Sequence, residues 1–267
     1  MLAEELTRLR KKSGISVREL ADKVGWDYSY LHRLETGRSL GGPEAIETLD
    51  TFYGTTPHLM ILWELAKDRA TFRDKYVRYL ELEAEATAIE HYAGSAIPGI
   101  LQTEAYARAW LWTVPHGPEN TAELEGQLEA RMGRQELLRR QPSVQLRAII
   151  DEAGLRRPLL DTEEWHKQLS HVVEAASQPN VTVRVLPFSV GLHNVQGQSL
   201  ILLMRPGGNT VAWLESFMGG ELYEEPESVE RLRLTYDALR DLALPPRDSV
   251  AFIEQLMEDS SPCDPPA

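Results

Sequence analysis

The segment of residues 16–38, SVRELADKVGWDYSYLHRLETGR, constrains the fold of this chain more than any other. Ser16 and Glu19 have the spacing of a capping box, which starts a helix. Gly25 allows a tight turn after that helix, and Asp27 is a favoured N-cap residue for the next one. Two short helices joined by a tight turn predict a helix-turn-helix motif here.

The helical pattern on both sides of this motif predicts a five-helix domain over residues 1–66. Apolar residues three or four apart indicate a first helix over residues 3–13 and a fourth helix that begins at Pro43. A fifth helix is expected over residues 56–63. The N-terminal part of the chain is therefore expected to be an all-α domain.

The rest of the chain has a different pattern. A charged helical repeat predicts a connector helix over residues 67–85, and residues 86–258 predict a mixed α+β domain with a small, partly antiparallel sheet. Strands are expected over residues 86–92, 144–151, 181–187, 198–205 and 210–215. Helices are expected over residues 103–111, 118–141, 162–176 with Thr162 as its cap, 226–242 and 247–257. Residues 259–267 are expected to be a disordered tail.

The placement of charge favours a DNA-binding function for the first domain, although the whole chain carries a net charge of −13. Residues 8–38 hold eight Lys or Arg and four Asp or Glu, a local excess of four positive charges. A basic segment on an acidic body suits a protein that binds non-specific DNA weakly, because the acidic body repels phosphates. The alternative is that these charges only coat a surface.

The second helix of the motif carries the expected DNA-reading face. If Leu31 and Leu34 point into the core, helical spacing turns four side chains outward, namely Tyr28, Ser29, His32 and Arg33. An α-helix fits the major groove, where an arginine such as Arg33 can make two hydrogen bonds to guanine. Phosphate contacts, which set register rather than sequence preference, are expected from Lys11, Lys12, Arg18, Lys23, Asp27 and Arg38. A helical domain that only packs or binds protein is the alternative.

Residues 3–66 resemble the lambda-repressor-like helix-turn-helix family, also called the xenobiotic-response-element family of regulators. The matching positions are Ile15-Ser16, Glu19-Leu20-Ala21, Gly25 and the LHRLETGR run over residues 31–38. The resemblance implies that Asp27, Tyr28, Ser29 and Arg33 face bases or flanking phosphates. It also implies a structural ion pair between Arg10 and Glu35. Val17 departs from the family, which commonly has a phosphate-binding glutamine there.

The C-terminal region resembles the corresponding domain of a large family of actinobacterial regulators. The resemblance rests on residues 97–108, 149–157, 168–193 and 236–249. It implies a role in developmental or antibiotic-production control. It also implies a small acidic protein partner in an antitoxin-like pairing, but it assigns no chemistry to the domain.

Catalysis, metal binding and a cofactor are not expected from the sequence. Four polar residues lie near predicted strand ends, namely Asp151, Glu152, His193 and Glu215, and such residues can perform acid–base chemistry. The chain lacks a phosphate-binding glycine loop, a paired-histidine zinc motif and a nucleophile elbow, so surface charge or the wall of a ligand pocket is favoured. Trp110 and Trp112 are expected in the core rather than in a pocket.

These observations favour a homodimeric, sequence-specific transcription regulator that binds a near-palindromic operator. Its C-terminal domain is expected to respond to a ligand or to a small protein partner. The alternative is an antitoxin-type interaction protein whose acidic body captures a partner while DNA binding serves autoregulation. The single cysteine, Cys263, and the absence of a long apolar run favour a cytoplasmic, nucleoid-associated protein without membrane contact.

Overall fold

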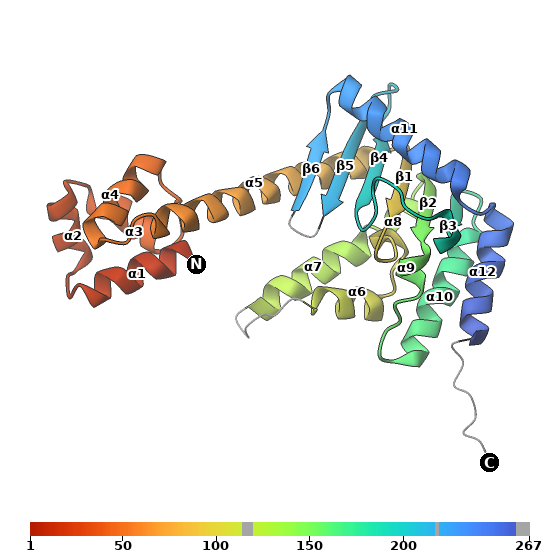
Figure 1. The fold of residues 1–267 in the computed structure, drawn as a ribbon, viewed down its shortest axis with the longest axis horizontal. Coiled ribbons are helices and arrows are strands. Elements are labelled where there is room, and N and C mark those ends of the chain that lie inside the picture. Colours follow the sequence, from red (N-terminus) through yellow and green to blue (C-terminus); the bar gives the residue numbers. More distant parts are fainter. Residues whose placement is uncertain (114–119, 217–218, 260–267) are drawn as a thin grey trace, which may run out of the picture. The chain divides into compact units, whose positions relative to one another are not determined.

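The computed structural model describes residues 1–113, 120–216 and 219–259, and it describes residues 68–74 by their backbone alone. The chain divides into two compact units, Met1–Lys75 and Tyr76–Ala267, which are described separately below. Figure 1 shows the elements of both units along the chain. The tail expected to be disordered lies outside the described residues from position 260 onward. None of the described helices is both long enough and apolar enough to cross a membrane.

The first unit is all-α, as the sequence predicts. Its helices are α1 (Leu2–Lys12), α2 (Val17–Val24), α3 (Tyr28–Glu35), α4 (Pro43–Tyr53) and the first part of α5 (His58–Glu85). One core joins them, because each of the first four helices contributes leucine or isoleucine side chains that are almost fully buried. Burial of these apolar stripes, rather than helix propensity, stabilises helices this short.

Local capping fixes both helices of the motif. The Ser16 hydroxyl accepts a hydrogen bond from the Glu19 N–H at 3.2 Å, and the Glu19 carboxylate accepts one from the Ser16 N–H at 2.7 Å. Gly25 has a φ of 73°, which an L side chain rarely adopts, and Asp27 then caps α3. The predicted capping box, turn and cap are all confirmed.

The beginning of α5 depends on a buried carboxylate that the sequence pattern does not reveal. Asp50, which is 1% exposed, accepts hydrogen bonds from the Leu59 and Met60 N–H groups at 3.0 and 3.2 Å. It also accepts one from the Thr55 hydroxyl at 2.7 Å. The prediction of a short fifth helix followed by a separate connector is wrong, because α5 runs unbroken from His58 to Glu85. No Gly or Pro interrupts that stretch.

The second unit is built on a six-stranded mixed sheet in the order β3-β2-β1-β4-β5-β6. Its strands are β1 (Ala88–Ala93), β2 (Gln145–Asp151), β3 (Val181–Leu186), β4 (Ser199–Met204), β5 (Thr210–Ser216) and β6 (Gly219–Tyr223). The first three strands pair in parallel, and β1, β4, β5 and β6 pair in antiparallel fashion. An all-α domain followed by an α+β domain with a partly antiparallel sheet is confirmed.

Helices cover both faces of this sheet. They are α6 (Glu104–Leu111), α7 (Thr121–Gly133), α8 (Glu136–Arg139), α9 (Glu152–Leu155), α10 (Thr162–Ala176), α11 (Pro226–Leu242), α12 (Pro246–Asp259) and the 3-10 turns Gly99–Leu101 and Phe188–Val190. Figure 1 shows α11 running across the strands, and its Val229 and Tyr236 pack on the face that bears Tyr92. Alternation along β1 places His91 on the opposite face from Tyr92.

Two helix predictions in this unit differ from the structure. The helix expected over residues 118–141 is divided, because α7 ends at Gly133 and α8 begins at Glu136, while positions 118 and 119 lie outside the described residues. Asp161, not Thr162, caps α10, and it accepts a hydrogen bond from the Glu164 N–H at 3.1 Å.

Strand β6 is absent from the prediction because it is short and begins with two glycines, which are depleted in strands. The structure gives Gly220 a packing role. A Cβ atom at that position would lie 2.1 Å from the Trp213 ring. The absence of a side chain at Gly220 therefore leaves room for the Trp213 indole of the neighbouring strand.

Candidate nucleic-acid interface

Helix α3 has one buried side and one exposed side. Leu31 and Leu34 are 1% and 2% exposed and belong to the core of the first unit. The four residues expected to read DNA are all exposed, namely Tyr28, Ser29, His32 and Arg33. The structure therefore brings the predicted reading residues together on one face of α3, and their contacts with bases stay a prediction.

Two aromatic groups and a guanidinium form a continuous surface at the start of α3. The Tyr28 and His32 rings stack with centroids 5.8 Å apart and planes 5° from parallel. The guanidinium carbon of Arg18, from α2, lies 5.7 Å from the centre of the Tyr28 ring. Sequence reasoning assigned Arg18 to phosphate and Tyr28 to bases separately, and it missed that Tyr28 links the two helices.

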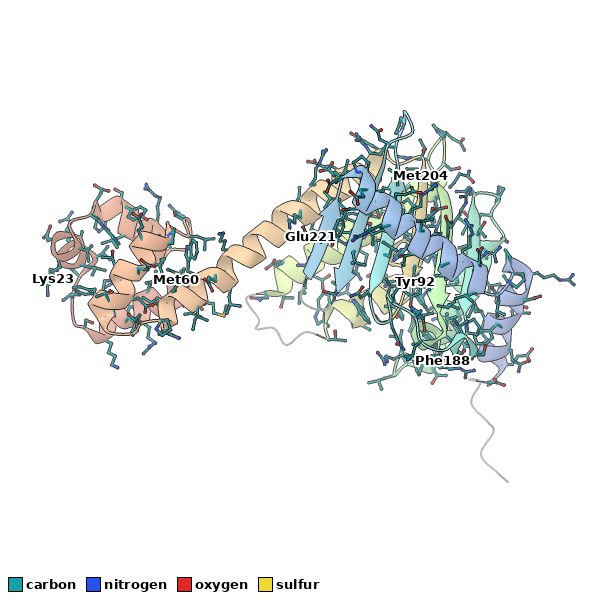
Figure 2. The ribbon with its side chains drawn as sticks, turned by 45° about the horizontal axis from the view of Figure 1, so that its top comes forward. Lys23, Met60, Tyr92, Phe188, Met204 and Glu221 are labelled. Atoms are coloured by element: carbon teal, nitrogen blue, oxygen red, sulfur yellow. The ribbon has the colours of Figure 1, made fainter. Side chains whose placement is uncertain are left out.

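The expected phosphate-binding cations lie on or directly after the first three helices. Lys11 and Lys12 end α1, Arg18 and Lys23 lie on α2, and Arg38 follows α3. All five are exposed, and within the described part of the chain none of them forms an ion pair. Figure 2 labels Lys23, which lies on α2 in the first unit. Unpaired, hydrated cations can neutralise phosphates without first giving up a protein partner.

Asp27 has a structural use that limits its role at a phosphate. Its carboxylate accepts a hydrogen bond from the Ser29 N–H at 2.7 Å. That backbone bond is the largest cause holding the pKa of Asp27 below its usual range, so the group stays ionised. A carboxylate repels phosphate, and the Asp27–phosphate contact stays a prediction.

Arg10 and Glu35 form an ion pair behind the reading face. The guanidinium donates from Nε and Nη2 to the two carboxylate oxygens at 2.7 and 2.8 Å. Arg10 also donates to the Ile15 carbonyl at 3.1 Å, and the hydrogen bonds to Glu35 raise the pKa of Arg10. Because the two side chains are only 14% and 7% exposed, this pair ties α1 to the end of α3 rather than meeting solvent.

In the second unit, two of the four candidate polar residues lie together. Tyr92 donates to an Asp151 carboxylate oxygen at 3.1 Å, and the His193 Nε2 lies 3.5 Å from the same oxygen. Glu152 instead pairs with Arg156 and accepts a hydrogen bond from the Phe188 N–H at 2.7 Å. Among the described residues, no group of three His, Cys, Asp or Glu side chains is placed to hold a metal ion.

Glu215 and Trp110 lie apart from that cluster, at a cavity on the face of the sheet that bears His91. The core-packing expectation is wrong for Trp110, which is 39% exposed and lines this cavity. Trp112 is half-buried, with the Arg108 guanidinium carbon 5.2 Å from its ring centre. No sequence pattern marked the cavity, because its walls come from segments far apart in the chain.

Two family models match the chain. One, described as a helix-turn-helix domain, matches residues 1–63, and it supports a DNA-binding regulator. The other, described as a domain of unknown function (DUF5753), matches residues 76–255, about two thirds of the chain. No curated protein and no solved structure matches the chain.

Proposed function

Because the chain belongs to the family that shares the domain of unknown function DUF5753 and carries a helix-turn-helix domain before it, we propose that it is a sequence-specific DNA-binding transcription regulator. We further propose that it binds a near-palindromic operator as a homodimer, and that the second unit controls this binding. The helix-turn-helix domain is the basis of the DNA assignment, and the finer points rest on the geometry below.

The observation that carries this proposal is the exposed side of α3. Arg33 and Ser29 project from a helix whose opposite side is locked into a core by Leu31 and Leu34. A rigid helix that presents an arginine and small polar groups suits major-groove recognition. The unpaired lysines and arginines around α3 supply the phosphate contacts that would hold it in register.

A dimer is proposed because one α3 helix alone can recognise only a short stretch of DNA sequence. The helix has eight residues and presents four candidate reading side chains. One such helix covers only a half-site, whereas a two-fold dimer places two recognition helices about one DNA turn, roughly 34 Å, apart. The operator is then expected to be a near-palindrome.

We assign the second unit to control by binding rather than to catalysis. Tyr92 hydrogen-bonds to both Asp151 and His193, and Glu152 is paired with Arg156. These interactions give Asp151, Tyr92 and Glu152 structural partners, while the buried Nδ1 of His193 has no hydrogen-bond partner among the described residues. A bound ligand or a small protein partner would act on DNA binding through this unit.

Footprinting on the DNA upstream of the gene that encodes the chain tests the proposal. We expect the wild-type protein to protect a near-palindromic site and Arg33→Ala to lose that protection, with specific affinity reduced by about tenfold or more. Arg231→Ala, which removes an exposed arginine of α11, is the matched control and should protect as the wild type does. Unchanged protection by a folded Arg33→Ala variant would refute base reading by α3.

A further inference from the structure

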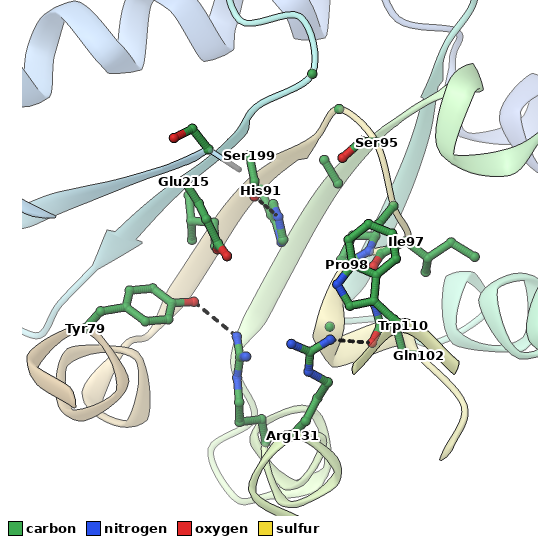
Figure 3. Close-up of a pocket in the computed structure, with 18 of the residues that line it drawn as sticks. Tyr79, His91, Ser95, Ile97, Pro98, Gln102, Trp110, Arg131, Ser199 and Glu215 are labelled. Atoms are coloured by element: carbon green, nitrogen blue, oxygen red, sulfur yellow. Dashed lines mark hydrogen bonds between the residues drawn. The ribbon is translucent and has the colours of Figure 1, made fainter. Parts of the chain in front are cut away.

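The second unit contains a cavity of about 360 Å³ on the face of the sheet that bears His91. Its walls come from the ends of β1, β4 and β5, from the loop after β1, and from α5, α6 and α7. Figure 3 shows Arg131, Trp110 and Glu215 around this space. The volume lies in the range of small-molecule sites, which is roughly 300–1,000 Å³.

Three arginines line this cavity, namely Arg131 near the end of α7, Arg134 directly after that helix, and Arg157. Of the first two, only Arg134 forms an ion pair. The Arg134 guanidinium donates to both oxygens of the Glu83 carboxylate at 2.6 Å and to the Tyr79 hydroxyl at 3.1 Å. Arg131 donates instead to the side-chain oxygen of Gln102 at 3.1 Å, which is an uncharged acceptor. Within the described residues, no carboxylate forms an ion pair with Arg131, although the charge of Glu215, which lines the same cavity, acts to raise its pKa.

The surroundings of Arg131 favour binding of a single negative charge. Burial lowers the pKa of Arg131, which means that the guanidinium is poorly solvated where it stands. An anion placed beside it would restore the lost interaction with water. Glu215 also lines the cavity, and its carboxylate would repel a ligand of higher negative charge.

The other residues that line the cavity suit a ligand with a flat apolar ring and a polar group at its edge. Trp110 lines the cavity and is 39% exposed, although tryptophan is normally mostly buried. His91 is 7% exposed and its Nε2 lies 2.8 Å from the Ser199 hydroxyl. Burial lowers the pKa of His91 to about 3, so this side chain is neutral at ordinary pH and adds no charge.

We propose that this cavity binds a small aromatic carboxylate, with Arg131 holding the carboxylate group and Trp110 contacting the flat ring. A carboxylate is favoured over a phosphate because its two oxygens match the fork of one guanidinium, whereas Glu215, which lines the cavity together with Arg131, Arg134 and Arg157, would repel a phosphate dianion more strongly. Binding is inferred from the cavity itself. Its effect on DNA rests on the proposed function, in which the second unit controls the first.

Calorimetric titration of the full chain tests the site with four probes: benzoate, 2-naphthoate, the uncharged 2-naphthamide, and phenyl phosphate. We expect the acids to bind, with 2-naphthoate the tighter, and the amide to bind at least tenfold more weakly. Tighter binding of phenyl phosphate would overturn the carboxylate assignment. Equal binding of the amide, or no heat from either acid at millimolar concentration, would overturn the proposal.

Two variants locate the binding. Arg131→Gln keeps a side chain that can hydrogen-bond to Gln102 but removes the charge, and it should weaken 2-naphthoate binding by at least tenfold. Arg139→Gln makes the same change at an exposed position of α8 that does not line the cavity, and it should bind as the wild type does. Equal affinity of the two variants for 2-naphthoate would show that the ligand binds outside this cavity.

The same probe separates failure of the site from failure of the proposed control. Operator affinity is measured with and without 2-naphthoate, in the wild type and in Arg131→Gln. An effect of 2-naphthoate on operator affinity that disappears in Arg131→Gln supports both the binding site and its control of DNA binding. Binding that depends on Arg131 but leaves operator affinity unchanged keeps the site and refutes control of DNA binding by this class of ligand.

Discussion

At the residue scale, a few side chains have roles that their residue type alone does not predict. Tyr28 serves the fold and the interface together, because its ring contacts both His32 on its own helix and Arg18 on the preceding one. His91 remains neutral because it is buried, and its interaction with Ser199 does not depend on charge. Single substitutions can therefore separate a reading role from a packing role.

A phosphate contact and a base contact should differ in how they respond to DNA sequence and salt. We expect Lys23→Ala to weaken binding to the operator and to unrelated DNA by a similar factor, because a phosphate contact carries no sequence preference. The slope of log affinity against log salt should fall by about one. Arg33→Ala should instead reduce the preference for the operator. A loss confined to the operator in Lys23→Ala would contradict the assignment.

His91 should make the second unit sensitive to acid. Its pKa in the folded chain, about 3, lies below the ordinary value of 6.5, so the unfolded chain takes up a proton first as pH falls. The contribution of neutral His91 is complete above pH 6.5 and is lost progressively toward pH 3, by up to about 1.4 kcal/mol per pH unit.

Urea unfolding at several pH values checks this expectation. His91→Gln retains an amide that can hydrogen-bond to Ser199 but cannot take up the proton, so its free energy of unfolding should fall less steeply with acid. His166→Gln, at a half-buried position of α10 away from the cavity, is the control and should keep the wild-type slope. Equal slopes in the wild type and His91→Gln would contradict burial of a neutral imidazole.

At the element scale, capping decides where helices begin. Ser16 and Asp27 cap their helices through neighbours two or three residues away, and this proximity made the motif readable from sequence. Asp50 caps α5 from an earlier helix, across nine residues to Leu59, and no local pattern reveals such a cap. The strands of the sheet show the same difference between local signals and contacts that are distant in the sequence. Local strand patterns predicted β1 to β5, whereas the Gly-Gly start of β6 gave no strand signal, although Gly220 packs against Trp213 of β5.

The same distinction explains what was predictable in the candidate sites. The reading face of α3 lies within six residues, so helical spacing from Leu31 and Leu34 predicted it. The cavity brings together Tyr79, Arg131 and Glu215, which are separated by more than fifty residues at each step. Only the order of the strands and the helices that cover them unites those residues. The prediction that Trp110 lies in the core was wrong for this reason, since the exposure of a side chain depends on which distant segments pack against it.

Removal of the buried carboxylate that caps α5 should destabilise the first unit. Asp50→Asn keeps the shape of the side chain but cannot accept all three hydrogen bonds, and we expect a loss of about 1–3 kcal/mol. Asp22→Asn, at an exposed position of α2, should change stability by less than about 0.5 kcal/mol. Thermal unfolding followed by circular dichroism would measure both, and equal losses would argue against the cap.

At the scale of the whole molecule, the chain contains two separate cores. One joins leucines of α1 to α5, and the other lies between the sheet and α11. The division falls inside α5, between Lys75 and Tyr76. A function that couples the two units must therefore be sought in the full chain, since each core can be stable without the residues of the other.

The two units should fold independently. A fragment of residues 1–75 and a fragment of residues 76–267 are each expected to unfold cooperatively. The first should bind non-specific DNA, whereas operator affinity should be lower than in the full chain if dimerisation requires the second unit. Dispersed amide NMR spectra would confirm folding of each fragment, and a collapsed spectrum for either would show that its core is incomplete.

The close approach of Gly220 to Trp213 has a consequence for the genetic tolerance of the chain. Every missense codon at position 220 encodes a residue with a Cβ atom, and that atom would lie 2.1 Å from the indole. A saturation library selected for function should therefore keep glycine alone at this position, whatever nucleotide change is introduced. Gly126 on α7, where nothing lies within 4 Å of an added Cβ, should accept alanine freely, so two glycine codons of the same gene would differ sharply in the number of substitutions that they tolerate.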